Sequence, residues 1–199
     1  ITGGARHLNV GKLLAGEPDW QRLSRSPYWL RRGYVEELYR LPRANSRAGA
    51  PQPLALASPP RPSLHELYQA HGDKVSDKWS LYLNEYDRLF SPYREQPVRL
   101  LEIGIQNGGS LEIWSKFFPN ARRLLGCDIN PRCARLQYDD ARIDVIVGDA
   151  TLDATRELIL AQSARWDLVI DDGSHTSRDI VRSFLTYFPH VEPGGLFVA

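Results

Sequence analysis

The sequence contains no methionine and only two cysteines, Cys127 and Cys133, in 199 residues. Two cysteines do not make a disulfide framework, so this composition favours a reducing, cytoplasmic location. No stretch approaches the roughly 20 apolar residues that a membrane-spanning helix needs, and the first residues lack the apolar segment of a signal peptide. Because the chain begins with Ile1 and lacks methionine, we expect it to be a piece of a longer protein.

The chain also lacks a large excess of charge, since its formal net charge is only +1. Residues 1–62 are basic, with ten Lys and Arg against four acidic residues. These basic residues are scattered singly and match no nucleic-acid-binding motif, which favours a solvated basic face and no nucleic-acid partner. A phosphate-binding loop at the start is excluded because six residues separate Gly4 from Gly11, where that loop needs four.

Three segments follow from the distribution of proline and of apolar residues. Residues 42–62 are rich in proline and alanine, which predicts an extended linker. In residues 1–41 the apolar spacing favours one or two short helices interrupted at Ser26-Pro27, which makes this segment a helical arm or the tail of an upstream domain. Residues 63–199 form the main domain.

The main domain alternates apolar, β-branched runs with helical patterns. This alternation predicts an α/β fold with a Rossmann-like, doubly wound parallel sheet and helices on both faces. The expected strands are 98–103, 123–128, 143–147 and 167–170, with a fifth that opens at Leu196 and is cut by the end of the chain. The expected helices are 64–71, 77–90, 110–118, a short one from Pro131, 152–163 and 177–188.

Ligands of open α/β sheets bind beyond the carboxyl ends of the strands, so the residues after each strand carry the functional signal. Gly104 and Gly108 follow the first strand of the main domain and allow a tight turn and a close approach of the backbone to a ligand. Asp128 ends the next strand, 24 residues after Gly104, where a carboxylate can bind ribose hydroxyls. The pattern predicts a cofactor that contains a nucleoside.

The loop after the first strand disfavours a dinucleotide. The Gly-x-Gly-x-x-Gly spacing is missing, and the carboxylate of Glu102 would repel a diphosphate, which argues against an NAD-linked oxidoreductase. The same carboxylate suits a cofactor that carries an ammonium and a sulfonium group. Asp149, in Val147-Gly148-Asp149-Ala150, lies where an acid can reach an adenine amino group.

These motifs together resemble a known family. Residues from about Ser76 to Ala199 resemble the class I S-adenosylmethionine-dependent methyltransferases. LLEIGIQNGGSLEIW, GCDINP, VGDA and DLVIDDGSH resemble the branch that contains macrolide-sugar and rhamnosyl O-methyltransferases. The resemblance implies an enzyme in which the cofactor's methionine end lies against Glu102, Gly104 and Gly108, its ribose against Asp128 and its adenine against Asp149.

The resemblance also implies a catalytic set after the fourth strand. Asp171 and Asp172 would help to hold a magnesium ion, with Asp171 also bordering the cofactor, and His175 would be the general base beside Asp172. The chemistry is consistent, because a sugar hydroxyl is a poor nucleophile that a divalent cation and a neutral imidazole would activate. The expected acceptor is a sugar or glycosylated natural product, although catechol-like diols would use the same metal.

Several alternatives stay open on the sequence alone. Aspartates such as Asp171 and Asp172 also cap helices, and His175 also fits a hydrogen-bonded turn. A rival function is a non-catalytic or fragmentary cofactor-binding or interaction module of a larger multidomain protein. An incomplete sheet would expose a strand edge to pairing with another chain, so a homo-oligomer or a fused upstream domain is a possible partner.

Overall fold

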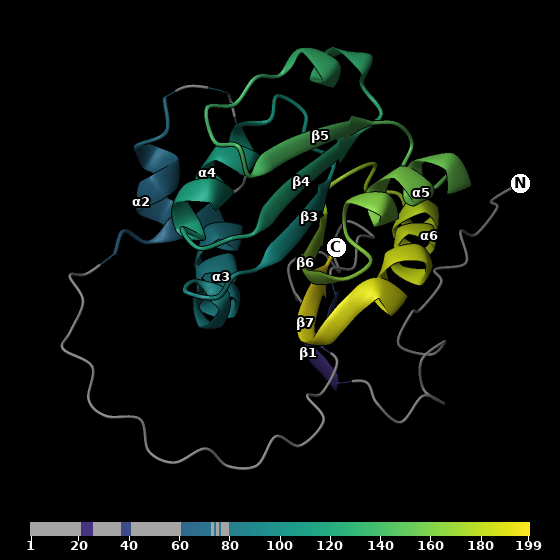
Figure 1. The fold of residues 1–199 in the computed structure, drawn as a ribbon. Helices are drawn as coiled ribbons and strands as arrows, with labels where there is room; N and C mark the ends of the chain where they lie inside the picture. Colours follow the sequence, from purple (N-terminus) through teal and green to yellow (C-terminus); the bar gives the residue numbers. More distant parts are fainter. Residues whose placement is uncertain (1–20, 26–36, 41–60, 73, 75, 77–79) are drawn as a thin grey trace, which may run out of the picture.

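The computed structural model describes residues 21–25, 37–40, 61–72, 74, 76 and 80–199 (Figure 1). The strands are β1 Gln21–Arg25, β2 Glu37–Arg40, β3 Arg99–Ile103, β4 Arg123–Asp128, β5 Ile143–Val147, β6 Trp166–Asp171 and β7 Val191–Val198. The α-helices are α2 Leu64–Gln69, α3 Ser80–Phe90, α4 Gly109–Phe117, α5 Asp153–Gln162 and α6 Ser177–Tyr187. Short 3-10 helices are η2 Ser91–Tyr93, η3 Pro131–Arg135 and η4 Phe188–His190. Within these ranges no helix is both long and apolar enough to cross a membrane.

The described strands form one sheet in the order β1-β2-β7-β6-β3-β4-β5. The pairs from β7 through β5 are all parallel, which confirms the predicted α/β architecture. Ile103 at the end of β3 is level with Cys127 of β4 on one side and with Asp171 of β6 on the other. The winding of the sheet reverses at β3, so the crevice typical of such switch points opens beyond these strand ends.

Helices cover both faces of the sheet (Figure 1): α2, α3 and α4 lie on one side, α5 and α6 on the other. The alternation of side chains along β3 explains the two layers, because Leu100 joins the core under α3 and α4 whereas Leu101 joins the core under α5 and α6. Each core has a fully buried tryptophan, Trp114 in the first and Trp166 in the second. The sheet is therefore held between two apolar layers and is rigid enough to position a site at its edge.

Local capping explains where two of the helices begin. The Ser63 hydroxyl accepts from the Glu66 amide while the Glu66 carboxylate accepts from the Ser63 amide, a reciprocal pair at the start of α2. At the start of α6, the Thr176 hydroxyl accepts from the Asp179 amide and donates to the Asp179 carboxylate. Both helices begin within a residue of the predicted positions.

The prediction that residues 1–41 form a helical arm is wrong where the structure describes them. Residues 21–25 and 37–40 are the strands β1 and β2, which pair antiparallel with each other, and β2 pairs antiparallel with β7. Pairing supplies hydrogen-bond partners to the backbone edge of β7, which a helix cannot do. The edge expected to be exposed to other chains is thus covered from within this chain. Residues 1–20, 26–36 and 41–60, including most of the predicted linker, lie outside the described residues, and the three-segment division stays a prediction.

Strand β7 begins at Val191, five residues before the predicted start at Leu196. The sequence between them is Glu192-Pro193-Gly194-Gly195, which is typical of a turn. The register explains the difference, since Trp166 pairs with Val191 and Leu168 with Leu196, so the extra residues form an irregularity in which Gly194 has a φ of 84°. A bulged strand of this kind does not show the regular pattern that strand prediction needs.

A partly buried ion pair fixes the end of α4. Arg142 donates to the Phe118, Pro119 and Ser115 carbonyl oxygens and is held by the Asp140 carboxylate. The Arg142 hydrogen bonds lower the pKa of Asp140. This carboxylate therefore stabilises the fold above its unfolded pKa, and the stabilisation is lost as the pH falls through the lowered folded pKa.

We expect Asp140→Asn to lower the free energy of unfolding by about 1 kcal/mol near neutral pH, because one charge-assisted contact is lost at a partly exposed site. The difference from the wild type should shrink as the pH falls from about 6 to about 2. Urea unfolding followed by circular dichroism over that range measures it. A difference that stays constant with pH would contradict the role assigned to the pair.

Candidate active site

A cavity of about 550 Å³ opens at the carboxyl ends of β3, β4, β5 and β6. Its size is within the range of small-molecule and cofactor sites. Its walls carry five carboxylates and one imidazole, and neither lysine nor arginine is among its lining residues; the charged or titrating side chains are Asp128, Asp149, Asp171, Asp172, His175 and Asp179. The electrostatic character of the cavity therefore favours a cationic ligand over a phosphate.

The loop after β3 approaches the loop after β6 too closely for a side chain. Gly104 has a φ of 83°, and a Cβ atom placed on it would lie 2.4 Å from the Asp172 carbonyl oxygen. Two backbone bonds fix this approach, from the Gly104 amide to the Cys127 oxygen and from the Asp172 amide to the Ile103 oxygen, each 2.8 Å. Gln106 and His175 also have positive φ, 49° and 54°, and both line the cavity. Such conformations concentrate at functional sites because the surrounding fold must hold them.

Asp128 lines the cavity and organises the loop opposite it. Its Oδ2 accepts from the Ile105 and Gln106 amides at 2.9 and 2.7 Å, and its Oδ1 accepts from the Asn130 amide at 2.8 Å. A carboxylate has about four acceptor positions, so three are used and Oδ1 retains one for a ligand hydroxyl. Asp128 thus combines a structural role with the predicted ribose contact.

Glu102 and Gly108 lie behind the cavity rather than on its wall. Glu102 is fully buried, and its Oε2 accepts from the Ser110 hydroxyl at 2.6 Å and from the Trp114 indole at 3.1 Å. Those two donors are one turn apart on α4, so the carboxylate fixes the start of that helix beneath the loop. Gly108 is the N-cap residue of α4 with a φ of 75°. The structure gives both residues a supporting position next to Ser110, which does line the cavity.

The far end of the cavity is formed after β4 and β5. Asp149 accepts from the amide and the hydroxyl of Thr151, each at 2.8 Å, which fixes its side chain in a tight turn. Ile129, directly after Asp128, lines the cavity although it is 69% exposed. An exposed isoleucine at a cavity wall offers an apolar surface to a flat ligand.

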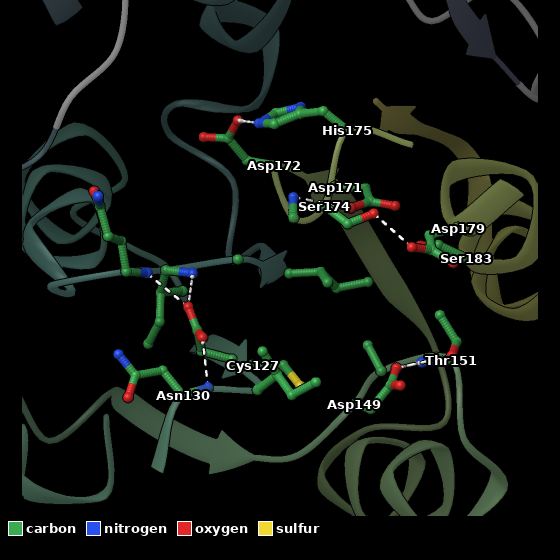
Figure 2. Close-up of a pocket in the computed structure, with 18 of the residues that line it drawn as sticks. Cys127, Asn130, Asp149, Thr151, Asp171, Asp172, Ser174, His175, Asp179 and Ser183 are labelled. Carbon is green, nitrogen blue, oxygen red and sulfur yellow. Dashed lines mark hydrogen bonds and ion pairs between the residues drawn. The ribbon is translucent and has the colours of Figure 1, made fainter. Parts of the chain in front are cut away.

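Asp171 is the last residue of β6, and Asp172 and His175 lie in the loop that follows it. Asp171 is buried, and burial raises the pKa of its carboxyl, while the nearby Ser183 hydroxyl and Gly173 amide oppose that shift. Asp172 is more accessible, and its Oδ1 is 3.6 Å from His175 Nε2. Figure 2 shows the Asp172 carboxylate directed toward the imidazole and the Asp171 carboxylate directed away from both.

The structure does not bring a full set of metal ligands together. No group of three or more His, Cys, Asp or Glu side chains is arranged to hold an ion anywhere in the part of the chain that the structure describes. Asp171 and Asp172 are adjacent in sequence at the strand end, but successive side chains leave an extended backbone on opposite sides. The metal assignment of these two residues therefore stays a prediction.

The thiol of Cys127 also borders the cavity, although the residue is buried. Burial and the neighbouring Asp128 and Asp149 raise its pKa to about 12. Since the thiolate is the nucleophilic form, Cys127 stays protonated and inert at neutral pH.

Sequence reasoning missed several lining residues: Ser76, Gln106, Ile129, Asn130, Thr151, Asp179 and Ser183. Two signals for them were present, because Asp149-x-Thr151 is a typical aspartate turn and Ile129 directly follows the predicted ribose carboxylate. Ser76 precedes β3 by more than twenty residues, so it lies outside the strand-end pattern from which the other site residues were predicted.

Comparison with known proteins decides the family. Residues 101–199 match the family model described as "Methyltransferase domain". Residues 101–199 belong to this family. The match begins within β3 and includes β4 to β7, and hence the carboxyl ends of all the strands that form the cavity, whereas Ser76 lies before it.

Similar proteins indicate which branch of the methyltransferases the chain resembles. The chain is 37% identical over 145 residues to mycinamicin VI 2''-O-methyltransferase of Micromonospora griseorubida, covering 69% of this chain and 35% of the relative. It is 34% identical to 8-demethyl-8-alpha-L-rhamnosyl tetracenomycin-C 2'-O-methyltransferase of Streptomyces olivaceus, covering 69% of this chain and 37% of the relative.

A solved structure, the MycE methyltransferase from the mycinamycin biosynthetic pathway in complex with Mg, SAH and mycinamycin VI, matches with a TM-score of 0.59 and 37% identity. It covers 69% of this chain and 36% of that chain. The methyltransferase domain therefore has the Rossmann-like class I fold, as predicted, and the resemblance to the macrolide-sugar branch is confirmed. The chain spans about a third of the length of these relatives.

Proposed function

We propose that this protein is an S-adenosylmethionine-dependent O-methyltransferase that acts on a hydroxyl of a sugar or glycosylated natural product. The observation that carries the proposal is the cavity at the switch point of the sheet, which is lined by five aspartates and by neither lysine nor arginine. S-adenosylmethionine carries a sulfonium and an ammonium group and no phosphate, so it matches this cavity, whereas a dinucleotide does not. The identity of the relatives as sugar O-methyltransferases supports the acceptor class.

The residues of the cavity fit such a cofactor from end to end. Asp128 would bind the ribose through its remaining acceptor position, and Asp149 and Ile129 would hold the adenine by a hydrogen bond and an apolar surface. Gly104 lets the loop backbone approach the methionine end, with Asp171 at the wall and Glu102 fixing α4 from behind. When bound, the cofactor supplies an activated methyl group.

Asp172 and His175 would prepare the acceptor hydroxyl. The Asp172 carboxylate faces His175 Nε2 at 3.6 Å, which favours a proton on that nitrogen and leaves Nδ1 free of it. The side chain of His175 is 60% exposed, so an acceptor hydroxyl can reach the ring from the open side of the cavity. Nδ1 would then take the hydroxyl proton, and Asp172 would stabilise the imidazolium that forms.

A magnesium ion fits the described residues in part. Asp171 and Asp172 provide hard oxygen donors of the kind that magnesium prefers, and magnesium often takes only one or two carboxylates and keeps its other positions for water. The third donor is not found among the residues described. An ion held by these carboxylates would lower the pKa of an acceptor hydroxyl.

We include a cytoplasmic location in the proposal because both cysteines are free.

Transfer of labelled methyl from S-adenosylmethionine to mycinamicin VI and to simple rhamnosides, with and without magnesium, tests this function. We expect a product that is one methylene heavier and whose formation increases with magnesium. If S-adenosylhomocysteine binds but no acceptor is methylated, the rival function gains support, namely a non-catalytic cofactor-binding module.

A further inference from the structure

The segment before α3 contributes to the cavity although it lies outside the matched methyltransferase domain. Ser76 lines the cavity, while every other lining residue belongs to the strand ends of the domain or to the segments that follow them. Its hydroxyl donates to the Tyr68 hydroxyl of α2 at 3.2 Å, which ties the segment to α2 on one side. A second set of contacts, in the cluster of His71, Lys74 and Glu112, involves two residues close to Ser76 in sequence and has no part in the proposed reaction.

Lys74 is the centre of this cluster. Its ammonium group forms a hydrogen-bonded ion pair with the Glu112 carboxylate, in the first turn of α4, and lies 4.5 Å from the centre of the Tyr138 ring. His71 completes the contact, because its Nε2 is 2.7 Å from the Lys74 carbonyl oxygen and 3.3 Å from Glu112 Oε2. The side chains of His71, Lys74 and Glu112 are 4%, 26% and 17% exposed, so the contacts are shielded from solvent screening.

The cluster continues into the loop that forms the cavity wall. The Tyr138 hydroxyl donates to the Gly108 carbonyl oxygen at 3.1 Å, and a Cβ atom on Gly108 would lie 2.0 Å from that hydroxyl oxygen. The Gly108 amide in turn donates to the Ile105 oxygen at 2.6 Å, within the loop. Lys74 therefore links three parts of the chain that are distant in sequence: His71, the start of α4 and the segment after η3.

We propose that Lys74 is a positioning residue: its contacts with Glu112 and Tyr138 form a clasp that holds Ser76 at the cavity and the Gly104–Gly108 loop in its binding conformation. This inference rests on the proposed function, since the cavity is taken to bind S-adenosylmethionine. Lys74 itself is not among the residues that line the cavity, so it acts through Glu112 and Tyr138. Without the ammonium group, Glu112 would lose its ion-pair partner at a partly buried place, and Ser76 would be held less firmly at the cavity.

The test replaces Lys74 by methionine, which keeps the length of the side chain and removes its charge. We expect the affinity of the chain for S-adenosylhomocysteine, measured by calorimetry, to fall about tenfold in Lys74→Met, which corresponds to about 1.4 kcal/mol. Lys74→Arg should restore most of the affinity, because arginine keeps the charge and the contact with the ring. Lys116→Met is the matched control, since Lys116 is exposed in the last turn of α4, the helix that carries Glu112.

Hydrogen exchange of the ligand-free chain provides a second readout that does not depend on the cofactor. In Lys74→Met we expect the amides of residues 104–110 to exchange at least about fivefold faster, with exchange in β4 and β6 unchanged. Tyr138→Phe should increase the exchange of the same loop, because the bond to the Gly108 oxygen is lost while the ring remains. Faster exchange throughout the molecule would mean general destabilisation and would overturn the clasp.

The outcomes separate the inference from the proposed function. If the wild type binds S-adenosylhomocysteine and Lys74→Met binds it equally well with unchanged exchange of the loop, the clasp is wrong and the function stands. If the wild type binds none, the proposed function fails and so does the ligand role of the clasp. Tenfold weaker binding with faster exchange confined to residues 104–110 supports both.

Discussion

Asp128→Asn is expected to weaken the binding of S-adenosylhomocysteine about 100-fold, a change of about 2.7 kcal/mol. The aspartate uses Oδ2 for the Ile105 and Gln106 amides and Oδ1 for the Asn130 amide. An asparagine has one acceptor oxygen and an amino group, so one side of this arrangement would place donor against donor. The loop would lose its anchor at the same time as the ribose loses a charged acceptor.

Asp153→Asn is the matched control for this variant. Asp153 begins α5, its side chain is 82% exposed, and it does not line the cavity. The control should bind as the wild type does. Unchanged affinity in Asp128→Asn, with both variants unfolding at the wild-type temperature, would remove Asp128 from the binding site.

Replacing Asp172 or His175 by alanine should reduce methyl transfer at least about 100-fold, which is the usual contribution of a positioned general base. Both variants should bind S-adenosylhomocysteine within about threefold of the wild type, because these side chains face the open side of the cavity and not the loop that Asp128 anchors. The double variant should be little worse than either single one, since the two residues act as a unit. Labelled methyl transfer to mycinamicin VI measures the rates.

His190→Ala provides the control for the histidine variant. His190 is the partly buried last residue of η4, which immediately precedes the start of β7, while the cavity lies beyond the carboxyl ends of the parallel strands. Its loss should leave turnover unchanged. Wild-type turnover in both Asp172→Ala and His175→Ala would contradict the mechanism, and a parallel loss of cofactor binding would show that these residues bind the cofactor instead.

The sheet and its ligand edge were predictable because β3 to β6 are short and largely apolar, and each of them ends in an aspartate or is followed by a glycine. Strands β4 and β5 agree with the prediction to the residue, and Asp128 and Asp149 lie at the cavity because parallel strands end at a common edge. Family resemblance supplied the assignment of roles, which local patterns alone left open. For Glu102, the sequence pattern identified the residue but did not predict that it lies behind the cavity wall.

The features that sequence reasoning missed depend on contacts between distant segments. The apolar spacing in residues 21–40 fits a helix as well as a strand, and only the unpaired edge of β7 favours the strand. Strand β7 begins with a bulge whose sequence is typical of a turn, so the sequence pattern placed the start of the strand too late. Ser76 lies at the cavity and Lys74 contacts Glu112 of α4, and both placements depend on contacts between residues that are distant in sequence.

Calorimetric titration of the 199-residue chain with S-adenosylhomocysteine, with NAD and ATP as comparisons, tests the central claim most directly. The account predicts binding in about the micromolar range, near −8 kcal/mol, for S-adenosylhomocysteine and none for the two phosphate-bearing ligands. Binding of NAD or ATP in preference to S-adenosylhomocysteine, by a chain shown to be folded, would contradict the assignment of the acidic cavity.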